Sequence, residues 1–137
     1  MTWEDDLKAK LKTPEQRQAE DEKRRREEHA AGCRAASDAL SEARRAFFKA
    51  QQLLAVRFSS SMSVMQTGED SSLEFPGHIL SVKRAEDGTG VIFSCDGEVT
   101  RLVFRSANTF AVDGGVTPMT PSEFGTFVGR KVSAIVT

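Results

Sequence analysis

Histidine and cysteine, which often bind metals or act as nucleophiles, are few and scattered in this sequence. Neither His29 nor His78 has a second ligand at metal-binding spacing, and Cys33, the thiol nearest to His29, would be alone with it. Cys95 precedes a predicted turn, where no cation or helix N-terminus would activate a thiolate. The sequence therefore predicts no metal, no cofactor and no catalytic nucleophile.

Polar side chains that could act together occur in two other places. Glu69 and Asp70 form an acidic pair in QTGEDSS, a stretch that is typical of a polar loop. The runs DGTG and VDGG lack the strand-loop-helix order and the Lys-Ser/Thr ending of a phosphate loop. The second place is one face of the predicted sheet, with Ser81, Lys83, Arg101 and Arg105. An enzymatic or small-molecule-binding domain that uses this sheet face is therefore an alternative function.

A basic run at Lys23–Arg26 raises the question of nucleic-acid binding. The whole chain is nearly neutral, with 19 basic and 20 acidic residues, so no overall field attracts phosphates. The run is also flanked by acidic residues at spacing four, which favours pairs along a solvated helix face. These pairs are Glu20 with Arg24, Asp21 with Arg25, Glu22 with Arg26, Lys23 with Glu27, and Arg24 with Glu28. Nucleic-acid binding through Lys23–Arg26, aided by Arg44 and Arg45, is the less favoured alternative.

The first 57 residues are predicted to be helical. They contain one proline and one glycine, and they are rich in Ala, Glu, Lys, Arg and Gln. Thr13, Pro14 and Gln16 match a helix start with a capping box, so a long helix is predicted over residues 14–57. A short amphipathic helix is predicted over residues 3–12, with Trp3, Leu7 and Leu11 on one face.

The second half of the long helix carries an apolar stripe at alternating spacings of three and four. Such a seam is typical of a helix that faces a partner helix, but an α+β domain also needs a stripe of this kind to cover its own sheet. The seam comprises Cys33, Ala36, Leu40, Ala43, Phe47, Ala50 and Leu54. Both interpretations remain open from the sequence.

The length of the helix favours association. From Pro14 to Arg57 an unbroken helix would measure about 66 Å, whereas a compact globule of the whole chain would be about 35 to 40 Å across. The helix is therefore expected to extend beyond its own domain unless it breaks at Gly32. A second copy of the chain is the simplest partner, because two-fold dimers are the commonest soluble oligomers.

From Ser59 onward the composition changes to Val, Phe, Ser, Thr and Gly with recurring turn signals, which predicts five to seven short antiparallel strands. Asp96-Gly97 is predicted to form a two-residue hairpin turn. Thr120, Pro121 and Glu123 predict a short helix that ends at Gly129. A last strand is expected near Lys131–Val136.

These patterns predict an α+β fold in which a long N-terminal helix packs on a small antiparallel meander, with a short C-terminal helix before the last strand. The helical segment covers residues 1–57 and the β-rich domain covers residues 58–137. No run of apolar residues is long enough to span a membrane, and the two cysteines are too few for a disulfide framework, so a cytoplasmic protein is expected. The favoured function is a non-catalytic assembly or adaptor module that forms a homodimer through the long helix. Its charged N-terminal part would be available to a further protein partner.

Overall fold

The computed structural model describes residues 2–11, 13–58, 62–105, 108–113, 115 and 117–136. The chain divides into two units, residues 1–30 and residues 31–137. Ser59, where the composition changes, and Lys12, at the end of the first predicted helix, lie outside the described residues.

The N-terminal unit consists of helix α1, Trp3–Leu11, and the first part of helix α2, Pro14–Phe58. A capping box starts α2, because the amide of Gln16 donates to Oγ1 of Thr13 at 3.2 Å and the amide of Thr13 donates to Oε1 of Gln16 at 3.0 Å. This start is the one that the sequence predicts. Every described residue from 2 to 30 is exposed, so packing supports none of this helical structure.

Helix α2 continues through Gly32, which is therefore not a break. Gly32 is buried, and a Cβ built on it would lie 2.8 Å from Cγ2 of Thr89 and 2.9 Å from Cβ of Thr89. The absence of a side chain thus lets α2 lie close to the loop that carries Thr89. In the described part of the chain, no helix combines the length and apolar character needed to cross a bilayer.

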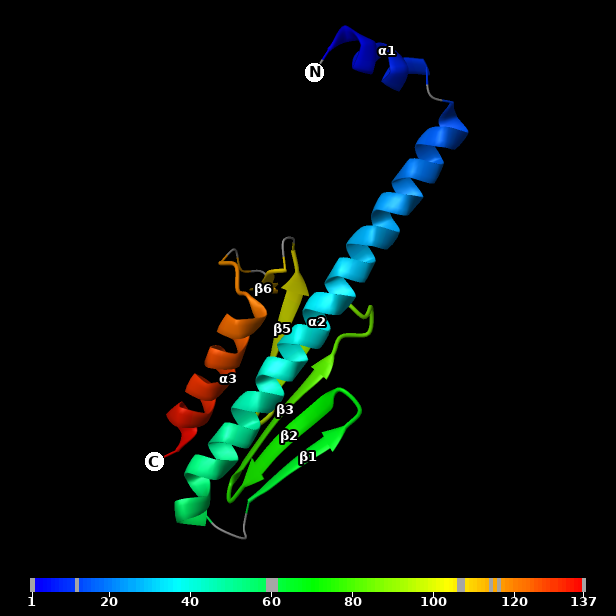
Figure 1. The fold of residues 1–137 in the computed structure, drawn as a ribbon. Helices are drawn as coiled ribbons and strands as arrows, with labels where there is room; N and C mark the ends of the chain where they lie inside the picture. The colour runs from blue at the N-terminus through cyan, green and yellow to red at the C-terminus, as the bar shows by residue number, and fades with distance from the viewer. Residues whose placement is uncertain are drawn as a thin grey trace. The chain divides into compact units, whose positions relative to one another are not determined.

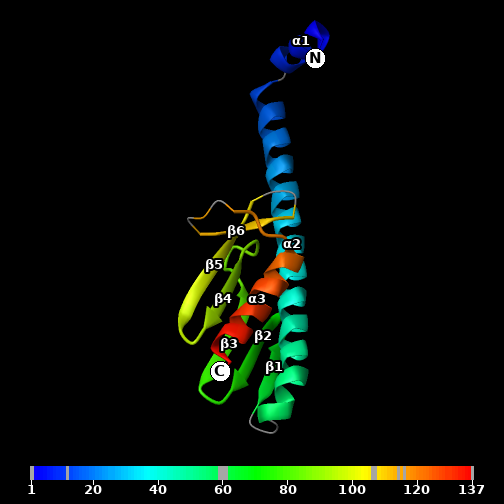
Figure 2. The ribbon, with the colours of Figure 1, turned by 90° about the vertical axis from the view of Figure 1, so that its left-hand side faces the viewer.

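The second unit is built on one six-stranded antiparallel sheet in the order β1-β2-β3-β4-β5-β6, a meander in which each strand pairs with the next. Figures 1 and 2 show its strands beside α2 and a C-terminal helix, α3, Pro121–Ile135. The strands are β1 Ser63–Thr67, β2 Asp70–Phe75, β3 His78–Arg84, β4 Val91–Cys95, β5 Glu98–Phe104 and β6 Phe110–Val112.

The hairpin between β4 and β5 has the predicted two-residue turn. Asp96 and Gly97 have φ angles of 51° and 89°, both in the left-handed region that a type I′ turn requires. This local signal fixes the register of the hairpin, in which Cys95 pairs with Glu98 and Phe93 pairs with Thr100.

Helices α2 and α3 cover the same face of the sheet, as Figure 2 shows. Residues alternate along each strand, so that Leu80 and Val82 of β3 are buried while Ile79 and Lys83 are exposed. The core between helices and sheet contains the fully buried side chains Phe47, Phe93, Phe110, Phe124, Leu40, Leu73, Leu80, Leu102, Val82, Val91 and Val128. The α+β architecture with a long helix on an antiparallel meander is therefore confirmed.

The predicted C-terminal order is wrong. The helix that begins at Pro121 does not end at Gly129 but continues to Ile135, so α3 follows the last strand and no strand forms near Lys131–Val136. The alternation in KVSAIV resembles a strand, but Val132 also lies eight residues after Phe124 and four after Val128. All three are buried against the core, and this helical spacing prevails because the extended helix buries Val132.

Candidate functional site

The apolar stripe of α2 faces the chain's own sheet. Most of its side chains belong to the core, Leu54 packs against the core, and Cys33 is half-buried. The core members, each with 9% or less of its surface exposed, are Ala36, Leu40, Ala43, Phe47 and Ala50. Side chains already packed within the chain are not available to a second helix. Ala50 and Leu54 also reach the groove described next.

An open groove of about 640 Å³ lies between α2 and α3, within the second unit. The two helices lie side by side in Figures 1 and 2, on the same face of the sheet. The lining of the groove is mainly apolar, and its apolar side chains are Ala46, Ala50, Leu53, Leu54, Val132 and Val136. Leu53 at its edge is 70% exposed. The groove therefore has the composition of a surface on which another apolar element could pack.

Two glycines of α3 shape the groove in different ways. A Cβ on Gly125 would lie 3.2 Å from Cβ and 3.3 Å from the carbonyl oxygen of Glu42, so this glycine allows α3 to approach α2 closely. A Cβ on Gly129 would meet no atom within 4 Å. Gly129 lies one turn further along α3 and also lines the groove. The helices thus touch near Gly125 and leave open space at Gly129.

Charged side chains stand along the α2 side of the groove. Glu42, Arg45 and Lys49 all line it, and Nη1 of Arg45 lies 3.3 Å from Oε1 of Glu42. This pair is exposed and spans three residues of one helix, so it contributes little to stability and can exchange partners. The groove therefore offers one acidic and two basic side chains on one rim.

The polar residues predicted to share a sheet face do so in part, but they do not converge. Ser81, Lys83 and Arg101 project from the face opposite to the helices, and Arg105 follows β5. Ile92 pairs with both Lys83 and Arg101, so two strand spacings, about 10 Å, separate these cations. Arg101 also lies 3.9 Å from Glu86. The three predicted site residues on these strands therefore share one face of the sheet, with β4 between the two cations.

Arg84 forms a polar cluster that the sequence did not indicate. Its guanidinium donates to both carboxylate oxygens of Glu69, each at 2.8 Å, and to Oγ of Ser37 at 2.6 Å. It also donates to the carbonyl oxygens of Cys33, at 3.1 Å, and Gly88, at 2.6 Å. One side chain of β3 thus joins α2, the β1-β2 turn and the β3-β4 loop.

The Arg84 cluster has a structural role. The hydrogen bonds from Arg84 hold the pKa of Glu69 below its ordinary value of 4.5, because they favour the ionised carboxylate. All five hydrogen bonds of the guanidinium end on groups of the same chain. The expected loop is limited to the turn at Gly68 and Glu69, because Asp70 begins β2 and pairs with Thr67, and Glu69 anchors this turn to Arg84.

His78 and Asp96 form a hydrogen-bonded pair, and the neighbouring Cys95 is a partly buried thiol. Nδ1 of His78 lies 2.7 Å from Oδ2 of Asp96, whose Oδ1 accepts from the amide of Ile79 at 2.7 Å. The His78 hydrogen bond lowers the pKa of Asp96, whereas burial raises the pKa of Cys95 and makes its thiol less reactive. The described residues contain no group of three or more His, Cys, Asp or Glu side chains that could hold a metal ion.

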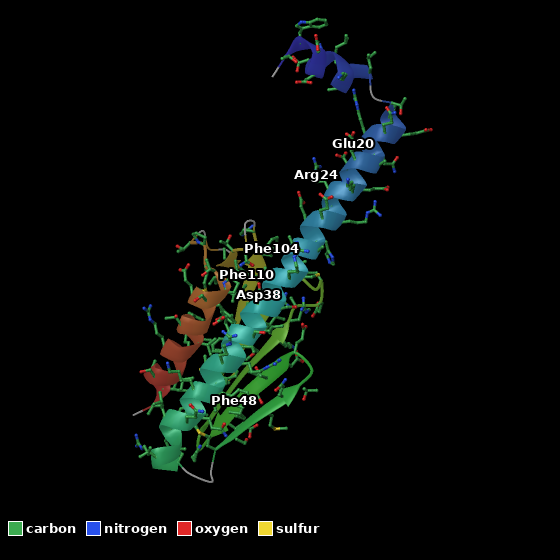
Figure 3. All side chains as sticks on the ribbon, in the orientation of Figure 1. Glu20, Arg24, Asp38, Phe48, Phe104 and Phe110 are labelled. Atoms are coloured by element: carbon green, nitrogen blue, oxygen red, sulfur yellow. The ribbon has the colours of Figure 1, made fainter. Side chains whose placement is uncertain are left out.

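The basic run on α2 lies among acidic side chains (Figure 3). Arg24 is 3.3 Å from Asp21 and 3.9 Å from Glu28, and all three side chains are exposed. Arg44, which the nucleic-acid interpretation would use, donates to the carbonyl of Gly68 at 3.2 Å. Arg24 and Arg44 therefore already have partners within the chain.

The groove between α2 and α3 is the feature that the sequence missed. The available signal was the pair Gly125 and Gly129 at spacing four, but Gly129 is interpreted from the sequence as the end of the helix. Comparison with other proteins adds no assignment: no protein-family model matches the chain, and neither curated proteins nor solved structures give a significant match.

Proposed function

We propose that this protein is a non-catalytic assembly module that associates with a second copy of itself. The observation that carries the proposal is the uncovered apolar face of α1. Trp3, Leu7 and Leu11 lie at spacing four on this helix and are 72%, 47% and 71% exposed. Three large apolar side chains in one row on a helix surface are typical of an interaction site.

The short length of α1 strengthens this argument. A helix of nine residues is marginal in water, because nucleation is costly and few hydrogen bonds offset it. Packing its apolar face would stabilise it, since burying one leucine side chain contributes about 1.5 to 3 kcal/mol. Tryptophan is also enriched among the residues that dominate binding energies. Association thus gives α1 the support that its own unit lacks.

Light scattering on the full chain tests the proposal. We expect the wild type to be a dimer and Leu7→Asp to dissociate at least tenfold more readily, because a carboxylate would have to be buried in the contact. Ala9→Asp is the matched control, since it adds the same charge to the opposite side of α1. A monomeric wild type, or equal effects of both variants, would contradict the proposal.

A further inference from the structure

We infer that the groove between α2 and α3 is the docking site for α1 of a second copy, with α1 antiparallel to α2. This inference rests on the proposed function, because it names the surface that receives the uncovered face of α1. Both surfaces of the proposed contact, the apolar face of α1 and the groove, then belong to every copy of the chain.

Gly129 is the first observation in its favour. A glycine inside a helix costs about 1 kcal/mol relative to alanine. At Gly125 the close approach of Glu42 requires it, whereas a Cβ on Gly129 would meet no atom of this chain within 4 Å. The open space at Gly129 lies in the groove. A docked helix would fill it and explain why no side chain projects there.

The dimensions of the two surfaces agree. Helix α1 has nine residues and is therefore about 13 Å long. The groove follows α2 from Glu42 to Leu54, which is about 18 Å. Leu53, Leu54, Val132 and Val136 provide the apolar end of the groove. An apolar face with three large side chains can therefore be covered along its whole length.

The charges select the direction of α1. Glu4 and Lys8 lie at spacing four on one flank of the apolar face of α1, about 6 Å apart along its axis. Glu42 and Lys49 lie about 10 Å apart along α2 and line the groove. In the antiparallel direction Glu4 approaches Lys49 and Lys8 approaches Glu42, whereas the parallel direction would bring like charges together. The antiparallel direction also places Trp3 at the apolar end of the groove.

A second copy of the chain is the simplest source of the docked helix. Each copy carries both the exposed apolar face of α1 and the open groove. Exchange of identical helices between two copies also gives a closed assembly with two equal contacts.

Gly129→Leu tests the groove on the full chain, with Gly129→Ala as its control. The leucine side chain would occupy the space of the docked helix, and we expect the dissociation constant from sedimentation equilibrium to rise at least tenfold. The alanine is expected to change it less than threefold. Both variants should keep the wild-type circular dichroism spectrum, because alanine and leucine favour a helix more than glycine and a Cβ on Gly129 meets no atom within 4 Å.

Mixing two dissociated variants tests whether α1 of one copy binds the groove of another. Leu7→Asp keeps an intact groove and Gly129→Leu keeps an intact α1, so an equimolar mixture should recover a heterodimer that neither variant forms alone. Fluorescence reports the same event, because Trp3 is the only tryptophan in the sequence and its emission should shift to the blue on mixing. Failure to recover a heterodimer would overturn the inference.

The outcomes separate this inference from the proposed function. A dimer that Leu7→Asp weakens but Gly129→Leu leaves intact would overturn the groove while association through α1 stands. A monomeric wild type whose Trp3 emission shifts to the red in Gly129→Leu would show docking within one chain and would overturn the second copy. If Glu4→Lys weakens the dimer and Lys49→Glu does not restore it in the double variant, the antiparallel direction is wrong.

Discussion

Replacing Arg84 with methionine should destabilise the fold more than its position on a half-buried strand end would suggest. Methionine keeps the apolar stem but removes all five hydrogen bonds of the guanidinium. It separates β3 from three segments at once, namely α2, the β1-β2 turn and the β3-β4 loop. The expected loss therefore comes from lost hydrogen bonds rather than from a cavity.

The size of the loss follows from exposure. The side chain of Arg84 is 23% exposed but that of Glu69 is 50% exposed, so screening limits their ion pair to about 1 kcal/mol. The hydrogen bonds to Ser37 and to the carbonyls of Cys33 and Gly88 are less exposed, and each contributes about 0.5 to 1 kcal/mol. We expect Arg84→Met to lower the free energy of unfolding by about 3 kcal/mol at pH 7.

The ion-pair part of this loss should depend on pH. The pKa of Glu69 is lower in the folded protein than its ordinary value of 4.5, so the unfolded chain binds more protons between these two values. The stabilisation by Glu69 is thus present above about pH 5 and is lost as the pH falls through the folded pKa. The difference between wild type and Arg84→Met should shrink by up to about 1 kcal/mol between pH 7 and pH 3.

Urea unfolding followed by circular dichroism measures both effects. Lys83→Met is the control, because the neighbouring lysine points to the exposed face of the sheet and should cost less than about 0.5 kcal/mol. A loss below about 0.5 kcal/mol for Arg84→Met would refute the structural role of the cluster. If the difference in free energy of unfolding between wild type and Arg84→Met stays constant from pH 7 to pH 3, the stabilising contribution of Glu69 is refuted.

Three further predictions concern packing, glycines and surface charge. Phe47→Ala should lower the free energy of unfolding by about 3 to 5 kcal/mol in urea titrations, because this side chain is fully buried in the core. Gly129→Ala should raise it by about 0.5 to 1 kcal/mol, whereas Gly32→Ala should lower it by about 1 to 2 kcal/mol, since its Cβ would lie 2.8 Å from Thr89. Arg24→Ala should change the thermal midpoint by less than about 2 °C, because its ion pairs are exposed.

Features with a short-range cause could be predicted from the sequence. The capping boxes at Thr13 and Thr120 each involve a residue three positions away, and both form. The Asp96-Gly97 turn depends on two adjacent residues that tolerate positive φ. The meander follows, because tight turns between short strands leave antiparallel pairing of neighbours as the simplest arrangement.

Features that depend on distant residues could not be predicted. The stripe through Leu40 and Phe47 has the same spacing whether it faces a partner or its own sheet, and only the folded sheet decides between them. The partners of Arg84 include Glu69, 15 residues away, and Cys33, 51 residues away. The groove requires α3 to extend past Gly129, which a rule that treats glycine as a helix end rejects.

Helix α2 has one continuous backbone but two different kinds of support. Its described residues before Ala31 are all exposed, whereas its buried residues begin at Gly32. Backbone amides before this point should therefore exchange with deuterium through local fraying of the helix, within seconds to minutes at neutral pH. Amides between Ala35 and Ala50 should exchange only when the domain unfolds. The two parts of this one helix would then open with different free energies. Slower exchange at Pro14–Ala30 in the presence of another molecule would identify that molecule as a partner of the charged segment.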